Sequence, residues 1–321
     1  MTAHFSYESS GKADSPALEK LDELAHYIGN TPLFPITNMH ENAKVKVFAK
    51  LEWQQFGGSV KARVAFNIIR EAVKNGSLGN GQHLLDASTG NTGIAYAIFA
   101  AVANIPLTLC MPANVTEERK NVLNALNVNV VYTPSHLGPQ GAHDVAKQIK
   151  SDKPDDFFFA DQYSNAQNWQ SHYHETATEI WEQTEGQVTH FVGGIGTGGT
   201  VVGVSKRFKE LNDQIKIIGL QPSSEVHGLD GWVHLKSAGS PKVFDHKASD
   251  SIVEVETEDA HKVLKDLVDN EGLMVSPSSA ANLKATLDLA DQLDEGTIVT
   301  VFPDDASKYG EVMSRIFNYQ A

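Results

Sequence analysis

Lys61 lies at the start of a predicted helix, a position in which a lysine could act as a nucleophile. Lys61 follows a glycine pair, Gly57 and Gly58, and a serine of the N-cap type, Ser59, and it precedes apolar residues at helical spacing. The positive end of a helix dipole disfavours an ammonium ion, so the neutral amine is easier to reach. A Schiff-base lysine needs that neutral amine. A solvated surface lysine is the ordinary alternative, so other residues must decide.

A polar loop between a predicted strand and a predicted helix could bind an anion. The strand 83–87 is followed by Ser88-Thr89-Gly90-Asn91-Thr92-Gly93. Backbone N–H groups, hydroxyls and one carboxamide would meet at a helix N-terminus, which suits a carboxylate or a phosphate. A plain helix cap is the structural alternative. Six small residues in a row favour the anion site.

A second glycine-rich loop, Gly194-Ile195-Gly196-Thr197-Gly198-Gly199-Thr200, also lies between a strand and a helix. Its glycines match the dinucleotide fingerprint, but the acidic residue expected about 20 positions later would fall near Leu220 and Gln221. The loop also lacks the Gly-Lys-Ser/Thr of a P-loop. Backbone amides and the hydroxyls of Thr197 and Thr200 remain, and they suit a phosphomonoester.

A third polar loop, Ser276-Pro277-Ser278-Ser279-Ala280-Ala281, leads into another predicted helix. One of its serines is expected to cap that helix, and another could offer its hydroxyl to the nitrogen of a heteroaromatic ring. A lysine, a carboxylate-binding loop, a phosphate cradle and a ring-facing hydroxyl together describe a site for pyridoxal phosphate.

The elements around these loops alternate between strands and helices. This rhythm predicts largely parallel sheets covered on both faces, in two α/β units with ligands bound in the cleft between them. The predicted strands span 44–51, 83–87, 107–111, 128–132, 157–160, 189–193, 215–220, 251–255 and 297–302, and the predicted helices after Lys61 span 92–103, 116–126, 138–150, 170–183, 200–211, 258–270 and 279–292.

Composition excludes several classes of function. The net charge of −14 argues against nucleic-acid or anionic-membrane partners. The single cysteine, Cys110, rules out a disulfide framework within one chain and reads as a buried, inert thiol. No apolar run is long enough to span a membrane and the first residues do not resemble a signal peptide, so we expect a cytoplasmic protein. The pair His172 and His174 lacks a third ligand, and no metal site is expected.

The chain resembles the β-family, or fold type II, of pyridoxal phosphate enzymes over nearly its full length. Within that family it is similar to the cysteine synthases, especially their type-B branch. The fold this implies is tryptophan synthase β-like, with two open, twisted, mostly parallel α/β domains. The residues that carry the resemblance are Ile28 to Leu33, Gly57 to Lys61, Gly90 to Ala95, Met111 to Asn114 with Glu118 to Lys120, Gly196 to Thr200, and Ser278 to Ala281.

The resemblance implies a role for each motif in holding the cofactor. Lys61 would bind the cofactor as a Schiff base and act as the base that removes the substrate Cα proton. Asn91 would hydrogen-bond the ring hydroxyl, and Ser278 would face the pyridine nitrogen. The 5′-phosphate would be held by the second glycine loop through Gly196, Thr197, Gly198, Gly199 and Thr200.

The resemblance also implies contacts to the substrate. These would come from the first polar loop, from the segment after the strand 157–160, and from a loop histidine that could gate the site or bind the second substrate, although such a histidine is more often simply solvated. The residues are Ser88, Thr89, Gly90, Thr92, Gln162 and His227.

The reaction implied is a transferase reaction, β-replacement on an activated serine. O-acetyl-L-serine would lose acetate to give bound α-aminoacrylate, and a sulfur nucleophile would add to form L-cysteine, with ping-pong kinetics. Residues 1–50 with 156–321 would form a larger domain that binds the cofactor phosphate, and residues 51–155 a smaller mobile domain with the carboxylate loop. A homodimer is expected.

The chain departs from the family pattern in ways that leave its substrate open, and three alternatives to cysteine synthesis remain. Ala62 stands where aspartate is usual, Ser88 and Thr89 reverse the common order, and Asp305 replaces a usual serine. A cystathionine β-synthase would use serine and homocysteine, and a serine or threonine dehydratase would share the elimination. A non-enzymatic binding protein is the third alternative, and the intact Lys61 argues against it.

Overall fold

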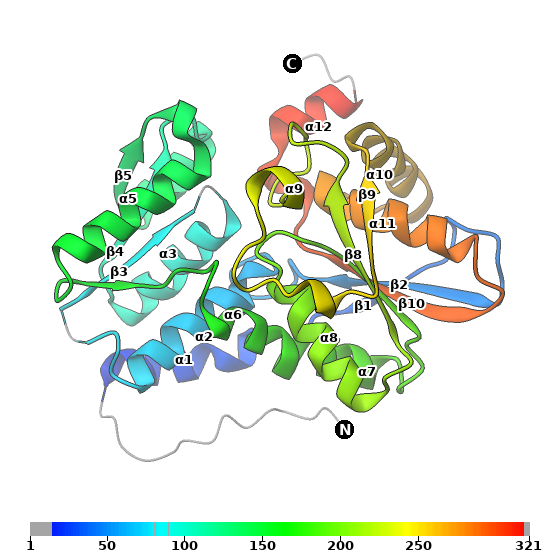
Figure 1. The fold of residues 1–321 in the computed structure, drawn as a ribbon, viewed down its shortest axis with the longest axis horizontal. Helices are drawn as coiled ribbons and strands as arrows, with labels where there is room; N and C mark the ends of the chain where they lie inside the picture. Colours follow the sequence, from blue (N-terminus) through cyan, green and yellow to red (C-terminus); the bar gives the residue numbers. More distant parts are fainter. Residues whose placement is uncertain (1–14, 80, 89, 318–321) are drawn as a thin grey trace. The chain divides into compact units, whose positions relative to one another are not determined.

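The computed structural model describes residues 15–79, 81–88 and 90–317, and it divides into two compact units. The smaller unit contains the described residues through Gly29 together with Lys61–Asp161, and the larger unit contains Asn30–Val60 and the residues from Gln162 onward. Figure 1 shows the elements of each unit. No helix among the described residues is long and apolar enough to cross a membrane.

The smaller unit is built on a four-stranded parallel sheet in the order β5-β4-β3-β6. Side chains alternate between the two faces of these strands, so both faces must be covered. Its strands are β3 (His83–Ala87), β4 (Leu107–Pro112), β5 (Asn129–Thr133) and β6 (Phe157–Phe159), and its helices are α1 (Pro16–Leu24), α2 (Lys61–Lys74), α3 (Asn91–Ala103), α4 (Glu117–Ala125) and α5 (Gly138–Asp152).

Neighbouring residues of β3 and β4 pack in two different core clusters, because they point to opposite faces of the sheet. Leu84 and Leu109 pack in a large cluster with α1, α2 and α3, while Leu85 and Cys110 pack in a smaller cluster with α5. The rings of Phe66 on α2 and Phe99 on α3 meet edge to face with centroids 5.5 Å apart. The packing therefore fixes α2 against α3 within this unit.

The larger unit is built on a six-stranded sheet in the order β1-β2-β10-β7-β8-β9, in which only β1 pairs antiparallel among the described strands. The strands are β1 (Leu33–Ile36), β2 (Val45–Leu51), β7 (His190–Gly194), β8 (Lys216–Pro222), β9 (Ser251–Val255) and β10 (Gly296–Phe302). The helices are α6 (Ala166–Ser171), α7 (Ala177–Gln183), α8 (Gly199–Leu211), α9 (Leu235–Ala238), α10 (Thr257–Glu271), α11 (Pro277–Ala290) and α12 (Gly310–Phe317).

Helices cover both faces of this sheet as well. One core cluster joins Val47, Ile298 and Phe302 to α10, α11 and α12, and another joins Phe191 and Val299 to α7 and α8. A π-helical turn, His172–Thr176, connects α6 to α7. The alternating strands and helices expected from the sequence are present, with ends that differ by a few residues.

The unit boundaries differ from those expected. Residues 1–50 are expected in the larger domain, whereas α1 belongs with the smaller unit because Leu21 is fully buried against α2 and α3. Arg70 of α2 also pairs with Asp22 of α1, with 2.7 Å between Nε and Oδ1. At the other boundary, β6 pairs with β3 and so carries residues through Asp161 into the smaller unit.

Candidate active site

Lys61 is the first residue of α2 and of the second segment of the smaller unit. The turn before it is shaped by Gly57 and Gly58, whose φ angles of 97° and 61° lie in the left-handed region that favours glycine. The Val60 amide donates to the carbonyl of Pro303 at 2.8 Å, both in the larger unit. The chain thus passes from a fixed turn directly into the helix that begins with Lys61. Ala62 is fully buried in the helical core, where a methyl group packs and a carboxylate would need a partner.

The first polar loop opens α3 as expected. Gly90 is its N-cap, and Ser88 Oγ accepts hydrogen bonds from the amides of Gly90 at 3.3 Å and Gly93 at 2.9 Å. Ser88 therefore contributes to capping the helix and still has its own hydroxyl hydrogen to donate. Asn91 and Thr92 occupy the first turn of α3, with Thr92 buried. Thr89 lies outside the described residues.

The second glycine loop connects β7 to α8 in the larger unit. Gly198 has a φ of 86° and caps α8, and a Cβ on it would lie 2.5 Å from Phe244 Cβ. A Cβ on Gly196 would lie 2.2 Å from the carbonyl oxygen of Gly231. These close approaches require glycine, so the donors that this loop offers are backbone amides and the hydroxyls of Thr197 and Thr200.

The helical segment after Gln162 packs directly behind this loop. Asn168 is fully buried in α6, and its Nδ2 donates to the Gln162 carbonyl at 2.7 Å and to Thr197 Oγ1 at 2.9 Å. His172 is fully buried in the π-helical turn, with Nε2 at 3.1 Å from Thr200 Oγ1. The structure therefore brings the predicted substrate residue Gln162 beside the predicted phosphate loop, through Asn168.

Ser278 lies in the first turn of α11 and is buried. Ser276 is the N-cap, because its Oγ accepts from the Ser279 amide at 3.2 Å. Ser276 Oγ also lies 3.1 Å from Ser278 Oγ and 2.8 Å from Ser279 Oγ, and Ser279 donates to the Asp304 carbonyl at 3.0 Å. Of the three serines, Ser276 has the capping role and Ser278 keeps a neutral hydroxyl. Helix α11 begins at Pro277, two residues before the expected start.

The segment that follows β8 covers the start of the glycine loop. The Val233 amide donates to the Ile195 carbonyl at 2.9 Å, and a Cβ on Gly194 would lie 2.2 Å from the Trp232 indole. His227 is half-buried in this segment, and its Nδ1 accepts from the Leu229 amide at 3.1 Å.

The surroundings of His227 favour its neutral form. Burial lowers the pKa of the imidazole, and His234 adds to this while Asp230 opposes it. Neutral His227 with Nδ1 accepting would carry its hydrogen on Nε2.

Each unit thus supplies a set of the predicted site residues. The smaller unit has the lysine and the α3 loop, and the larger unit has the glycine loop, Gln162 and Ser278. The residues that the sequence analysis missed are Asn168 and His172. Their spacing of four on a helical segment was a visible signal, but their partners lie about 30 positions away in sequence, at Thr197 and Thr200. Among the described residues, no group of three or more His, Cys, Asp or Glu side chains could hold a metal ion.

Comparison with protein families gives one match. Residues 24–304 match the family model described as "Pyridoxal-phosphate dependent enzyme". This match spans all the loops described above.

Comparison with individual proteins gives similar chains of nearly the same length. The chain is 40% identical to a cysteine synthase of Aquifex aeolicus, over 93% of this chain and 94% of the relative. It is 33% identical to an O-acetylserine dependent cystathionine beta-synthase of Bacillus subtilis, over 90% and 96% of the two chains. Among solved structures, a cysteine synthase (OASS) of Entamoeba histolytica matches with a TM-score of 0.86 and 29% identity, over 100% and 95% of the two chains.

Proposed function

The chain belongs to the family of pyridoxal-phosphate dependent enzymes, and we propose that it is a cysteine synthase that replaces the β-acetoxy group of O-acetyl-L-serine by sulfide. The family, the fold type and the cofactor expected from the sequence are confirmed by the family match and by the solved relative. The observation that carries the activity is the 40% identity to a cysteine synthase over 93% of the chain.

The donor set of the glycine loop fits the cofactor's phosphate. The loop and the first turn of α8 offer amide hydrogens and two hydroxyls, and no acidic residue lies between Gly194 and Thr200 to repel an anion. The buried Ser278 fits a pyridine nitrogen, because a hydroxyl can donate a hydrogen bond to it without transferring a proton. In this proposal Asn91 holds the ring hydroxyl. The residues present therefore suit the group that the family binds.

When bound, the cofactor withdraws electrons from the substrate Cα and so makes loss of the β-substituent possible. In this proposal Lys61 would hold the cofactor covalently through its amine and would act as the base that takes the proton from the substrate Cα. Residues of the α3 loop orient the substrate carboxylate, with Gln162 as a further contact. They are Ser88, Thr89, Gly90 and Thr92, of which Ser88 also caps the helix.

Visible spectroscopy of the purified protein tests this proposal. Addition of O-acetyl-L-serine should shift the visible band of the bound cofactor to longer wavelength, and sulfide should restore the band and release L-cysteine. Lys61→Ala should keep the fold but lose both responses. A cofactor band that O-acetyl-L-serine leaves unmoved would refute the substrate assignment while leaving the cofactor in place.

A second candidate is a cystathionine β-synthase, which the Bacillus subtilis relative favours. Because that relative is named for O-acetylserine as well, the two candidates differ in the sulfur nucleophile. The same spectroscopic experiment separates them when homocysteine replaces sulfide. Faster return of the band with homocysteine, with cystathionine as product, would favour the second candidate. A dehydratase would instead release pyruvate from serine without any added thiol.

The proposal also includes properties of the whole enzyme. We expect a cytoplasmic homodimer, and we expect the smaller unit to move when substrate binds. Light scattering at several protein concentrations measures the mass, and small-angle scattering with and without O-acetyl-L-serine measures any closure. His227 is assigned to gating or to the second substrate, so His227→Gln should change KM for sulfide more than KM for O-acetyl-L-serine.

A further inference from the structure

Both threonine hydroxyls of the glycine loop are contacted from behind by buried side chains. Asn168 Nδ2 lies 2.9 Å from Thr197 Oγ1, and His172 Nε2 lies 3.1 Å from Thr200 Oγ1. Asn168 and His172 are fully buried and four residues apart, so they lie on one face of the same helical segment. We call these two residues the backing pair.

The direction of the first hydrogen bond follows from its neighbours. Asn168 Nδ2 also lies 2.7 Å from the Gln162 carbonyl oxygen, which can only accept, so this atom is the amide nitrogen and donates. Thr197 Oγ1 therefore accepts from Asn168. Its one hydroxyl hydrogen is left to donate to another group.

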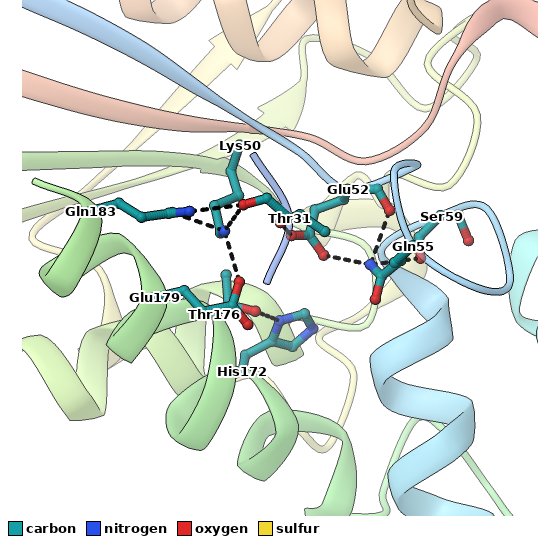
Figure 2. A network of polar contacts seen from close by, with 9 residues as sticks. All are labelled: Thr31, Lys50, Glu52, Gln55, Ser59, His172, Thr176, Glu179 and Gln183. Atoms are coloured by element: carbon teal, nitrogen blue, oxygen red, sulfur yellow. Dashed lines mark hydrogen bonds and ion pairs between the residues drawn. The ribbon is translucent and has the colours of Figure 1, made fainter. Parts of the chain in front are cut away.

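The direction of the second hydrogen bond depends on which ring nitrogen of His172 carries the hydrogen. His172 Nδ1 lies 2.9 Å from Thr176 Oγ1 (Figure 2), so Thr176 contacts the ring nitrogen that does not face Thr200. A hydroxyl can donate to Nδ1, and Nε2 then carries the hydrogen that Thr200 accepts. Single π-helical turns within helices often mark functional sites.

Close packing keeps the backing pair in place. A Cβ on Gly199 would lie 1.9 Å from Asn168 Oδ1, and a Cβ on Gly203 would lie 2.2 Å from the Trp169 carbonyl oxygen. Helix α8 thus approaches the segment 168–173 at backbone distance, and neither side chain of the backing pair can move far from its threonine.

We propose that Asn168 and His172 are positioning residues that donate to Thr197 and Thr200, and thereby direct both hydroxyl hydrogens toward a bound phosphate. A phosphate monoester offers acceptors, and a hydroxyl has a single hydrogen, so a threonine can donate to the phosphate only when that hydrogen is not already donated to a neighbour. Because the backing pair donates to both threonine oxygens, it leaves both hydroxyl hydrogens for the phosphate. This inference rests on the proposed cofactor site, and it adds two residues that do not themselves touch the cofactor.

The test compares two amide substitutions at one position. His172→Gln can place an amide nitrogen near the position of Nε2, whereas His172→Asn is one methylene shorter and cannot reach Thr200. Titration of cofactor-free protein with pyridoxal 5′-phosphate should give a Kd about tenfold higher for His172→Asn, the effect of one hydrogen bond, and within about threefold of wild type for His172→Gln. The ³¹P resonance of the bound phosphate should move only in the Asn variant.

A double-mutant cycle separates positioning from general support of the fold. Thr200→Val removes the hydroxyl that His172 orients, so in this background the Asn and Gln variants should bind the cofactor equally well. A difference that persists in the Thr200→Val background would overturn the inference. Thr176→Val offers a second route if His172→Asn does not fold, because it removes the hydroxyl that holds the His172 ring. Thr176→Val should lower the affinity for the cofactor several-fold, and this loss should also vanish in the Thr200→Val background. Wild-type protein that fails to bind the cofactor would instead refute the proposed function.

Discussion

Cys110 carries the only thiol of the chain, and its surroundings make it a poor nucleophile. The side chain is fully buried in β4, and burial together with the nearby Asp86 carboxylate raises the pKa of the thiol to about 11. At pH 7 such a thiol is ionised in about one molecule in ten thousand, and the thiolate is the reactive form. The sulfur in the proposed reaction must therefore come from the second substrate.

This environment predicts an unreactive cysteine in the folded protein. An aromatic disulfide reagent should label Cys110 quickly in denaturant and hardly at all under native conditions at pH 7. The same slow native labelling should hold with and without cofactor, because the thiol has no part in binding it. Rapid labelling of the native protein would show that β4 exposes the thiol.

At the scale of elements, a buried polar network ties β2 to α7 and explains the Asn30-Thr31-Pro32-Leu33 motif (Figure 2). Lys50 is fully buried on β2 and pairs with Glu179 on α7 at 2.7 Å. Its Nζ also donates to the Thr31 carbonyl at 2.6 Å, and the Thr31 hydroxyl donates to Glu52 at 2.7 Å. This part of the family resemblance thus has a structural role, which is to anchor the helix that follows the backing pair.

A substitution at Lys50 should lower the stability of the protein strongly, and a second substitution at Glu179 should restore much of it. Lys50→Met removes one member of a buried ion pair, leaves the Glu179 carboxylate without that partner, and should lower the free energy of unfolding by about 3–5 kcal/mol. Adding Glu179→Leu should recover much of this loss, since the buried charge is then gone. Denaturant unfolding of the two single variants and the double variant measures the coupling. Additive losses would mean that the two charges do not depend on each other.

For the whole molecule, histidines whose pKa is lowered by folding make the folded state sensitive to acid. Burial is the largest cause that lowers the pKa of His174, His190, His227 and His261 below the usual value. Within the described part of the chain, His261 Nε2 is buried without a hydrogen-bond partner. Below about pH 6.5 the unfolded chain takes up protons that the folded protein does not, so stability is complete above this pH and is lost as the pH falls toward the lowered folded values.

We therefore expect the midpoint of thermal unfolding to fall between pH 7.5 and pH 5.5. His261→Gln removes one of these titrating groups and should make that fall shallower, whatever its effect at pH 7.5. The matched control is His136→Gln, a change at an exposed histidine of the smaller unit. A slope that His261→Gln leaves unchanged, or that the control alters equally, would contradict the assignment.

Local patterns in the sequence were enough to predict most of the elements. Short apolar runs and a long apolar segment that follows a polar loop are local features, so β3, β10 and α3 appear within one residue of where they are expected. The anion site of the glycine loop could also be predicted, since glycine and threonine before a helix imply such a site whatever the fold. The short helix α12 was not predicted.

What the sequence could not provide were pairings between distant residues. The unit boundary missed α1 because a contact such as Asp22 with Arg70 leaves no local pattern. Asn168 and His172 were missed for the same reason. His172 was considered only as a metal ligand, because its partner Thr200 lies 28 positions away.

The order of strands in the larger unit has a consequence for how the protein is made. Strand β10 lies between β2 and β7, yet it comes last in sequence among the described strands. While the ribosome is still adding residues before Gly296, β2 and β7 have no common neighbour, and the six-stranded sheet cannot close. The strands of the smaller unit, in contrast, are all complete by Phe159. The two units therefore become able to fold at different times during translation, and the larger one must wait until β10 has been made.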